Sequence, residues 1–130
     1  MRKAGHAFAR DMTALSKETQ WLTLTHGDLQ DMEGSHVYNV LGKPYVIDFG
    51  FARYAPFYID LVDYFSFENA ALYHKALTNK GFSLSRPDFE ERFRAAYRYP
   101  CFIYMFPSIM QWKSGSKERL LKLLHRAFSG

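Results

Sequence analysis

The chain has 130 residues, the size of one ordinary domain, and its composition, 48% hydrophobic and 23% charged, excludes a disordered protein. No apolar run reaches the roughly 18 residues needed to cross a bilayer, so we expect no membrane span. The formal charge is +4, but the basic residues are dispersed. We therefore interpret them as solvated helix faces. Binding of an anionic substrate or partner is the second interpretation, and nucleic-acid binding is disfavoured.

The cysteine content and the N-terminus indicate the compartment. The single cysteine, Cys101, excludes an internal disulfide and lies in an apolar stretch, where we expect a buried, unreactive thiol. The first residues have no continuous apolar segment typical of a secretory signal. We expect a cytoplasmic protein.

The N-terminal half predicts one helix, one short strand and a β-hairpin. Residues 3–18 carry apolar positions at helical spacing among good helix formers, and residues 21–25 are short and β-prone. Two apolar runs at 36–41 and 44–49 are separated only by Gly42-Lys43. That spacing predicts a hairpin, because glycine supplies the positive φ that a two-residue loop needs.

The C-terminal half predicts helices, at 56–77, 86–98, 101–112 and 117–128. Gly81 is expected to follow the end of the first helix, and Ser85 to cap the start of the second. The third is nearly all apolar, so we expect it to be buried, with a kink or a division at Pro107. Together these elements predict a single, mostly helical α+β domain spanning residues 1–130.

Three acidic motifs follow one another along the chain: His26-Gly27-Asp28-Leu29, Ile47-Asp48-Phe49-Gly50 and Asp60-Leu61. The predicted hairpin joins the first two motifs and should bring Asp28 and Asp48 to one edge. Phosphoryl transfer needs such a pair: one carboxylate to accept the proton of the attacking hydroxyl, and oxygen ligands for the Mg²⁺ that bridges the nucleotide phosphates. Gly50 would let the backbone turn sharply past the metal.

In this order and spacing, the motifs resemble the aminoglycoside phosphotransferase and choline kinase superfamily of protein-kinase-like enzymes. The resemblance covers about residues 23–61, from "LTHGDL" through "YVIDFGFARYAPFYIDL", as the catalytic core. The helical remainder, 62–130, is consistent with the C-terminal lobe of that fold but has no motif of its own. The resemblance implies ATP- and Mg²⁺-dependent transfer of a phosphoryl group to a hydroxyl of a small molecule or sugar.

The resemblance also implies a role for each motif residue. Asp28 resembles the catalytic base, and His26 the loop residue that steadies the catalytic backbone. Asp48 looks like the principal Mg²⁺ ligand and, with Gly50, forms part of the cofactor site. Asp60 matches an acid that usually supports the catalytic loop through hydrogen bonds.

The other Mg²⁺ ligand is left open among three residues. Kinases of this type place an Asn five residues after the catalytic Asp, and here Glu33 stands at that position. Glu33 is favoured on position, because a carboxylate oxygen ligates Mg²⁺ readily. Asn39 has the expected side chain but lies inside the first predicted hairpin strand, and Asp31 is a third candidate.

Several other polar and aromatic residues are given no chemical role. Asp63 is interpreted as an exposed helix acid, and three histidines have no partner at metal-ligand spacing: His36, His74 and His125. An aromatic cluster offers rings for stacking on a sugar or a cation, but we interpret it as core packing: Tyr97, Tyr99, Phe102, Tyr104 and Phe106.

The resemblance is confined to a C-terminal lobe. Nothing before His26 resembles an N-terminal ATP-binding lobe, which would contribute a Gly-rich loop and a strand-borne lysine. We therefore expect an incomplete phosphotransferase that works with an N-lobe, another partner chain or a second copy. The alternative is a non-catalytic, pseudokinase-like module that docks a partner through exposed aromatic residues.

Overall fold

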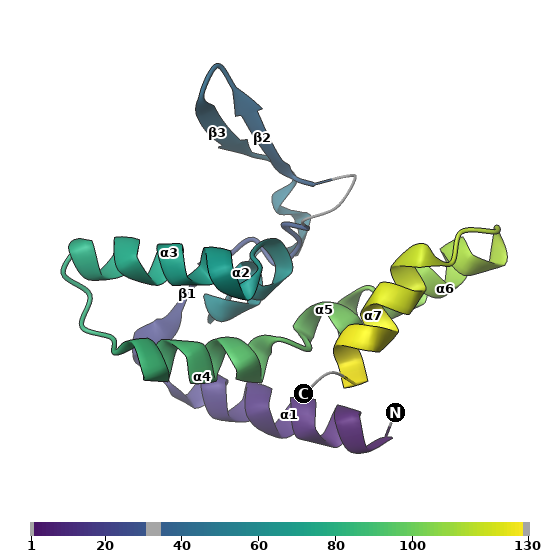
Figure 1. The fold of residues 1–130 in the computed structure, drawn as a ribbon, viewed down its shortest axis with the longest axis horizontal. Helices are drawn as coiled ribbons and strands as arrows, with labels where there is room; N and C mark the ends of the chain where they lie inside the picture. The colour runs from purple at the N-terminus through teal and green to yellow at the C-terminus, as the bar shows by residue number, and fades with distance from the viewer. Residues whose placement is uncertain (1, 31–34, 129–130) are drawn as a thin grey trace.

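The computed structural model describes residues 2–30 and 35–128 and shows a mostly helical molecule with two small antiparallel sheets. In Figure 1, α4 (Arg86–Ala96) lies between α1 (Arg2–Lys17) and α3 (Phe67–Asn79), and the short α2 (Tyr58–Tyr64) adjoins α3. A second group of helices extends to one side: α5 (Tyr99–Ile103), α6 (Met105–Lys113) and α7 (Glu118–Phe128). The mostly helical α+β class expected from the sequence is confirmed.

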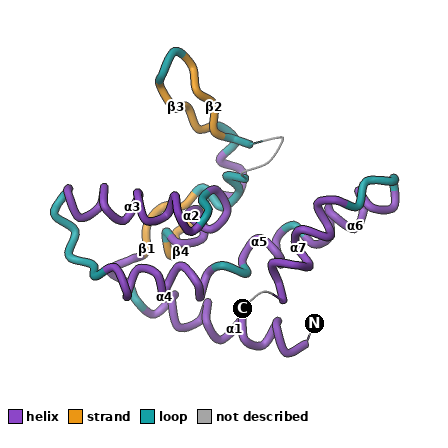
Figure 2. Tube along the Cα trace, viewed as in Figure 1, coloured by secondary structure: helices purple, strands orange, loops and turns teal. Residues whose placement is uncertain are grey.

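The strands form two separate pairs, visible in the tube view (Figure 2). β1 (Leu22–Thr25) pairs antiparallel with β4 (Arg53–Pro56), and β2 (Val37–Val40) pairs with β3 (Lys43–Val46) in a hairpin that projects from the helices. The strand near 21–25 and the hairpin agree with the prediction. β4 was not predicted, because four residues with a terminal proline carry no pattern and their partner strand is distant in sequence.

The hairpin turn is shifted by one residue from the prediction. Val40 pairs with Lys43, so the turn residues are Leu41 and Gly42, with φ of 52° and 80°, rather than Gly42 and Lys43. Positive φ at both central positions is the type I′ geometry that suits the twist of a hairpin. Leu41 adopts it at a cost of about 1 kcal/mol and is 99% exposed.

The helix predicted over 56–77 is two helices. Phe65 is extended, and the Ser66 side chain accepts a hydrogen bond from the Asn69 backbone N–H (3.3 Å), which caps α3. A serine cap satisfies one of the unpaired N–H groups of a new helix start, so the chain breaks where the apolar spacing alone suggested continuity. The cap at Ser85 was predicted correctly, since its side chain accepts from the Asp88 N–H (3.2 Å).

The segment 101–112 is divided, but three residues before the predicted position at Pro107, and its predicted burial is wrong. The break falls at Tyr104, and Pro107 lies in the first turn of α6, where a missing N–H removes no helical hydrogen bond. Phe106 is 73% exposed and Trp112 53% exposed. α6 packs mainly against α7 and α5, so those neighbours leave much of its apolar surface uncovered.

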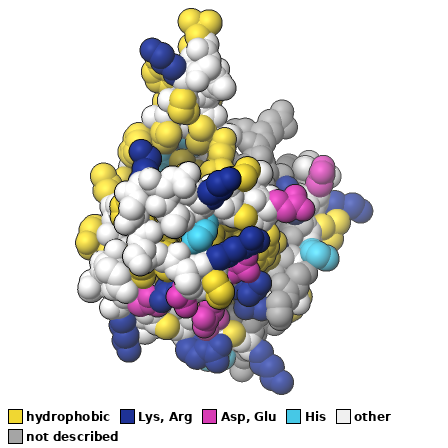
Figure 3. Space-filling view, turned by 60° about the vertical axis from the view of Figure 1, so that its left-hand side comes forward, with side chains coloured by type: hydrophobic (Ala, Val, Ile, Leu, Met, Phe, Trp, Pro, Cys, Tyr) yellow, Lys and Arg dark blue, Asp and Glu magenta, His cyan; other side chains and the backbone are white. Residues whose placement is uncertain are grey.

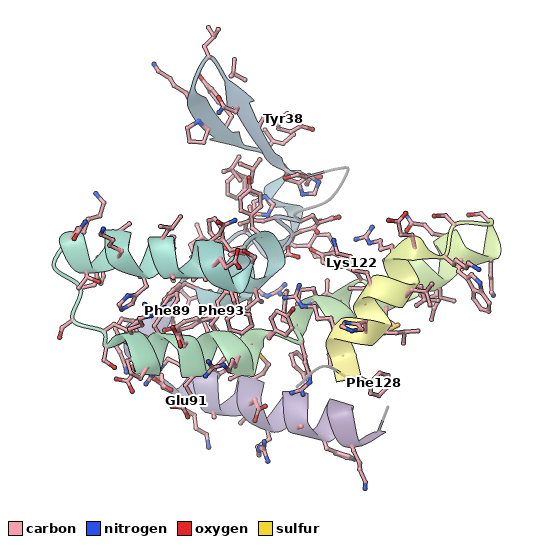
Figure 4. All side chains as sticks on the ribbon, viewed as in Figure 1. Tyr38, Phe89, Glu91, Phe93, Lys122 and Phe128 are labelled. Carbon is pink, nitrogen blue, oxygen red and sulfur yellow. The ribbon has the colours of Figure 1, made fainter. Side chains whose placement is uncertain are left out.

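Two clusters of buried side chains hold the molecule together. The larger joins α1, α2, α3 and α4 and includes Phe89 and Phe93, which are labelled on α4 in Figure 4. The smaller fixes α7 to α5 through Cys101, Tyr104, Leu123 and Ala127. Cys101 is buried as predicted, and burial raises the pKa of its thiol, which keeps it protonated and unreactive. None of the described helices is both long enough and apolar enough to cross a membrane.

The buried hydroxyl of Tyr58 gives a test of the larger core. This hydroxyl has no hydrogen-bond partner among the described residues, and burial raises its pKa. An unsatisfied buried polar group destabilises a protein, so Tyr58→Phe should raise the free energy of unfolding by about 1 kcal/mol. Urea denaturation measures this, with the exposed Tyr45→Phe as a control that should change nothing. A loss of stability in Tyr58→Phe would show that the hydroxyl is hydrogen-bonded in solution.

Candidate functional site

The candidate site is built on the loop that leaves β1. The Thr25 hydroxyl donates to the Arg53 carbonyl of β4 (2.9 Å), which holds the end of β1 in place. Gly27 follows with φ of +81°, and a Cβ atom there would lie 2.7 Å from the carbonyl oxygen of Phe51. Glycine is therefore required at this position for both its conformation and its size.

The Asp60 carboxylate anchors this loop. Its Oδ2 accepts the His26 backbone N–H and its Oδ1 accepts that of Gly27, both at 2.8 Å. Asp60 lies in the first turn of α2, so the loop is tied directly to a core helix. This is the supporting position that the sequence resemblance implied for Asp60.

The His26 ring connects the two loops that carry the candidate acids. The Asp28 backbone N–H donates to His26 Nδ1 (3.2 Å), so Nδ1 is an acceptor and the hydrogen lies on Nε2. Nε2 then donates to the carbonyl of Ile47 (2.7 Å), the residue before Asp48. The buried imidazole, in this neutral tautomer, fixes the backbone of one acid against the backbone of the other.

A second histidine, His36, lies between the two carboxylates. Its Nδ1 donates to the Asp28 carbonyl oxygen (2.6 Å) and lies 3.7 Å from Asp28 Oδ2, while its Nε2 lies 3.9 Å from Asp48 Oδ2. The structure thus brings Asp28 and Asp48 to either side of one imidazole ring. The sequence interpretation gave His36 no chemical role, and its position between the two acids was not predicted. A signal was present, because His36 comes directly before the first hairpin strand, at the base of the hairpin that joins the two acids.

Asp48 differs sharply from Asp28 in its surroundings. The Asp48 side chain is 64% exposed and that of Asp28 only 13%. Asp48 adopts φ of 59°, and its Oδ1 accepts the Gly50 N–H at a long 3.4 Å. A left-handed non-glycine residue costs about 1 kcal/mol, and such strain is concentrated at functional sites. Asp48 therefore presents nearly unoccupied carboxylate oxygens, the donor type that Mg²⁺ prefers.

Asp63 is buried, which corrects its interpretation as an exposed helix acid. The Tyr104 hydroxyl lies 2.6 Å from Asp28 Oδ1 and 2.8 Å from Asp63 Oδ2. One hydroxyl hydrogen cannot serve both carboxylates, so the second short contact requires a proton on an acid. Burial raises the pKa of Asp63, and the charge of Asp28 adds to the rise, although hydrogen bonds from Gln30 and Tyr104 oppose it. The raised pKa of Asp63 favours this acid as the site of the proton.

Gln30 extends the network away from Asp28. With φ of 50°, it donates its backbone N–H to Asp63 (3.0 Å) and its side-chain amide to Asp28 Oδ1 (2.7 Å). Its amide oxygen accepts from the Arg119 guanidinium of α7 (3.1 Å), which also lies over the Tyr104 ring. None of these contacts was predicted, because Gln30 and Arg119 are 89 residues apart and no local sequence pattern indicates that they meet.

Of the three candidates for the other metal ligand, the structure describes only Asn39. Glu33 and Asp31 lie outside the described residues. Asn39 pairs with Pro44 in the middle of the hairpin, and β3 continues from Pro44 to Val46 before the chain reaches Asp48. Within residues 2–30 and 35–128, no group of three or more His, Cys, Asp or Glu side chains is arranged to hold a metal ion.

No protein-family model matches the chain, and no curated protein matches it either.

The raised pKa of Asp63 predicts a pH dependence of stability. An acid whose pKa is higher in the folded state stabilises the fold when it is protonated. This stabilisation is complete below the pKa of 3.8 that Asp63 has in the unfolded chain, and it is lost as the pH rises through the higher pKa of the folded state. Asp63→Asn keeps the shape without the charge. The free energy of unfolding of the variant, relative to the parent chain, should therefore increase from pH 4 to pH 7.

Urea denaturation at a series of pH values measures this difference, with the exposed Glu91→Gln as a control for general charge effects. The prediction is wrong if the difference in free energy of unfolding between variant and parent chain does not change with pH, or if the parent chain becomes relatively more stable as the pH rises. Either result would show that folding does not raise the pKa of Asp63.

Proposed function

We propose that this chain is the catalytic lobe of an ATP- and Mg²⁺-dependent phosphotransferase, with a kinase-like C-terminal lobe fold. The acceptor is a hydroxyl of a small molecule or sugar. The observation that carries the proposal is the placement of Asp28 and Asp48 on two loops joined through His26, with one carboxylate nearly buried and the other open to solvent. Phosphoryl transfer needs these two environments: a fixed proton acceptor beside an accessible metal ligand.

Asp28 is the base in this proposal. Its Oδ1 is held by Gln30 and Tyr104, so the side chain has one orientation, and among the described residues its Oδ2 lies beside the His36 ring, at 3.7 Å. The acceptor hydroxyl gives its proton to this carboxylate while its oxygen bonds to the γ-phosphorus. The bond between that phosphorus and the ADP oxygen breaks, and ADP leaves.

Asp48 supplies the metal ligand, and its oxygens fit that role. They are exposed, and the single hydrogen bond that Oδ1 accepts from Gly50 is long. A bound Mg²⁺ would bridge the nucleotide phosphates and offset the charge that develops on them. Glu33 remains the proposed additional ligand on its position in the sequence.

The nucleotide base needs apolar cover, and the surface beside Asp48 is apolar. Ile47, Phe49 and Phe51 are all exposed around it. We propose that this surface contacts the adenine and an N-terminal lobe that completes the pocket, provided by another part of the polypeptide or by another chain. The buried thiol of Cys101 fits the reducing, cytoplasmic setting in which ATP is used.

Two substitutions separate the proposed roles. Asp48→Asn should weaken Mg²⁺-dependent ATP binding at least about tenfold, because a neutral amide is a poor ligand for a hard cation. Asp28→Asn should leave that binding within about twofold but abolish phosphotransfer to an acceptor in the presence of a complementing lobe, since the amide cannot accept the proton. Calorimetry with ATP, with and without Mg²⁺, measures the binding.

Glu91→Gln is the matched control, because Glu91 is an exposed carboxylate on α4, away from the site (Figure 4). Unchanged Mg²⁺-ATP binding in Asp48→Asn, or an equal loss in Glu91→Gln, would overturn the metal assignment.

A second function, docking to a partner without catalysis, is favoured by one observation. The hairpin is exposed and apolar on both faces, and Figure 3 shows hydrophobic side chains gathered over this projection. The residues are Tyr38, Val40, Leu41, Tyr45 and Val46. An isolated two-stranded hairpin is marginally stable in water, and an exposed apolar patch normally marks an interaction site.

The docking function predicts self-association or binding of an apolar dye that depends on the hairpin. Leu41→Asn should reduce both at least about threefold, because it removes an exposed apolar side chain while asparagine tolerates the left-handed turn. Analytical ultracentrifugation and dye fluorescence are the measurements. Leu72→Asn, at an exposed site on α3, is the control and should change neither. A monomeric parent chain that binds no dye would remove the support for docking.

A further inference from the structure

We propose that a cavity beside Asp28 binds the acceptor through an anionic group, so that the acceptor is a small hydroxyl compound carrying a phosphate or a carboxylate. This inference rests on the proposed function and adds the chemical class of its substrate.

The cavity has a volume of about 320 Å³, within the range of small-molecule sites. One part of its wall is formed by Gln30, Asp63 and Tyr104, the three residues of the network around Asp28. Another part is formed by cationic side chains of α7, including Arg119 and Lys122. A ligand in this cavity therefore lies between a concentration of positive charge and the side chains that hold the proposed base.

The charge on this wall follows from the helix period. Arg119, Lys122 and Arg126 are spaced i, i+3 and i+7, so they share one face of α7. The Arg126 guanidinium has a structural role, because it donates hydrogen bonds to the carbonyl oxygens of Tyr97 and Val62. Arg126 also lines the cavity, so its positive charge still acts there. These positions were interpreted from sequence as a solvated helix face, whereas they line a cavity next to the site.

Arg119 and Lys122 are the two groups placed to take an anion. Arg119 donates one N–H to Gln30 and keeps further donors on its guanidinium. Lys122 is exposed at the cavity, is labelled above α7 in Figure 4, and forms no ion pair within the described part of the chain. Asp63 is the only carboxylate among the described lining residues, and its Oδ2 already contacts the Gln30 N–H and the Tyr104 hydroxyl.

The arrangement also sets the size of the acceptor. The Gln30 side chain bridges the Arg119 guanidinium and Asp28 Oδ1, through contacts of 3.1 and 2.7 Å. An anion at Arg119 and a hydroxyl at Asp28 can therefore belong to one molecule of sugar-phosphate or hydroxy-acid size. Asp28 Oδ1 is occupied by Gln30 and Tyr104, so the acceptor hydroxyl would meet the base at Oδ2, which lies beside the His36 ring and toward the proposed nucleotide site.

Binding of simple probes to the full chain tests this inference without any turnover. By calorimetry in low salt, glucose 6-phosphate and gluconate are compared with glucose and with the cationic glucosamine. The anions should bind at least about tenfold more tightly than glucose, and glucosamine should not bind. Whichever anion binds more tightly distinguishes a phosphate from a carboxylate acceptor.

Charge removal then locates the site. Lys122→Gln should weaken the binding of the anions at least about fivefold, and Arg119→Gln should do so to a similar degree. Lys113→Gln, at an exposed cation at the end of α6, removes the same charge away from the cavity and should have no effect. Arg119 also supports Gln30, so Lys122→Gln, whose side chain has no such contact, is the decisive variant, and thermal unfolding confirms that it folds.

Three results would overturn the inference: equal binding of glucose and its 6-phosphate, equal losses in Lys122→Gln and Lys113→Gln, or displacement of the anion by Mg²⁺-ATP. The last would make this a nucleotide-phosphate site. Failure of the proposed function gives a different result. In that case Asp48→Asn leaves Mg²⁺-ATP binding unchanged, while the anions still bind and still depend on Lys122.

Discussion

The candidate site depends on one interaction, the pair of hydrogen bonds between the Asp60 carboxylate and the loop after β1. A chain that leaves a strand and passes through the interior must satisfy its backbone N–H groups, and no strand pairing is available beyond Thr25. Asp60 accepts two of these groups at once, from His26 and Gly27. Because Asp60 belongs to the first turn of α2, the core that buries this helix also determines where Asp28 lies.

The site concentrates carboxylates in a protein of net positive charge. Asp28, Asp60 and Asp63 all lie on or beside one loop, and each has a different means of tolerating burial. Asp60 accepts backbone N–H groups, Asp63 has a raised pKa and a short contact with the Tyr104 hydroxyl, and Asp28 keeps one oxygen turned toward His36. The cationic face of α7 supplies compensating charge at the other side of Tyr104, where the Arg119 guanidinium lies over its ring. Charges of both signs are thus separated by a single aromatic side chain.

Much of the local structure was predictable from sequence because its causes are local. The Ser85 cap, the hairpin and the helix over 117–128 each follow from residues a few positions apart. The prediction failed at Ser66, where a helix cap interrupts an apolar spacing that suggested one continuous helix. It also failed at the hairpin turn, where Leu41 rather than Lys43 joins Gly42 in the positive-φ conformation. β4 has no local cause at all, since it is a strand only through its pairing with β1.

The site was predictable only in part, for the same reason. Asp28, Asp48 and Asp60 are carried by recognisable motifs, and the structure brings them together. Tyr104 and Arg119 reach the site from far along the chain, through the packing of α5 and α7, and no pattern near them indicates this contact. Their placement is a property of the tertiary fold.

The projecting hairpin has a mechanical consequence. The chain passes from Asp28 to Asp48 only by way of this hairpin, and His36 and Ile47 are bonded to each other at its base. A partner bound to the exposed tip is therefore connected to both carboxylates through the base of the hairpin. If binding at the tip alters the spacing of the two acids, a ligand that spans the acids must, by thermodynamic reciprocity, alter binding at the tip.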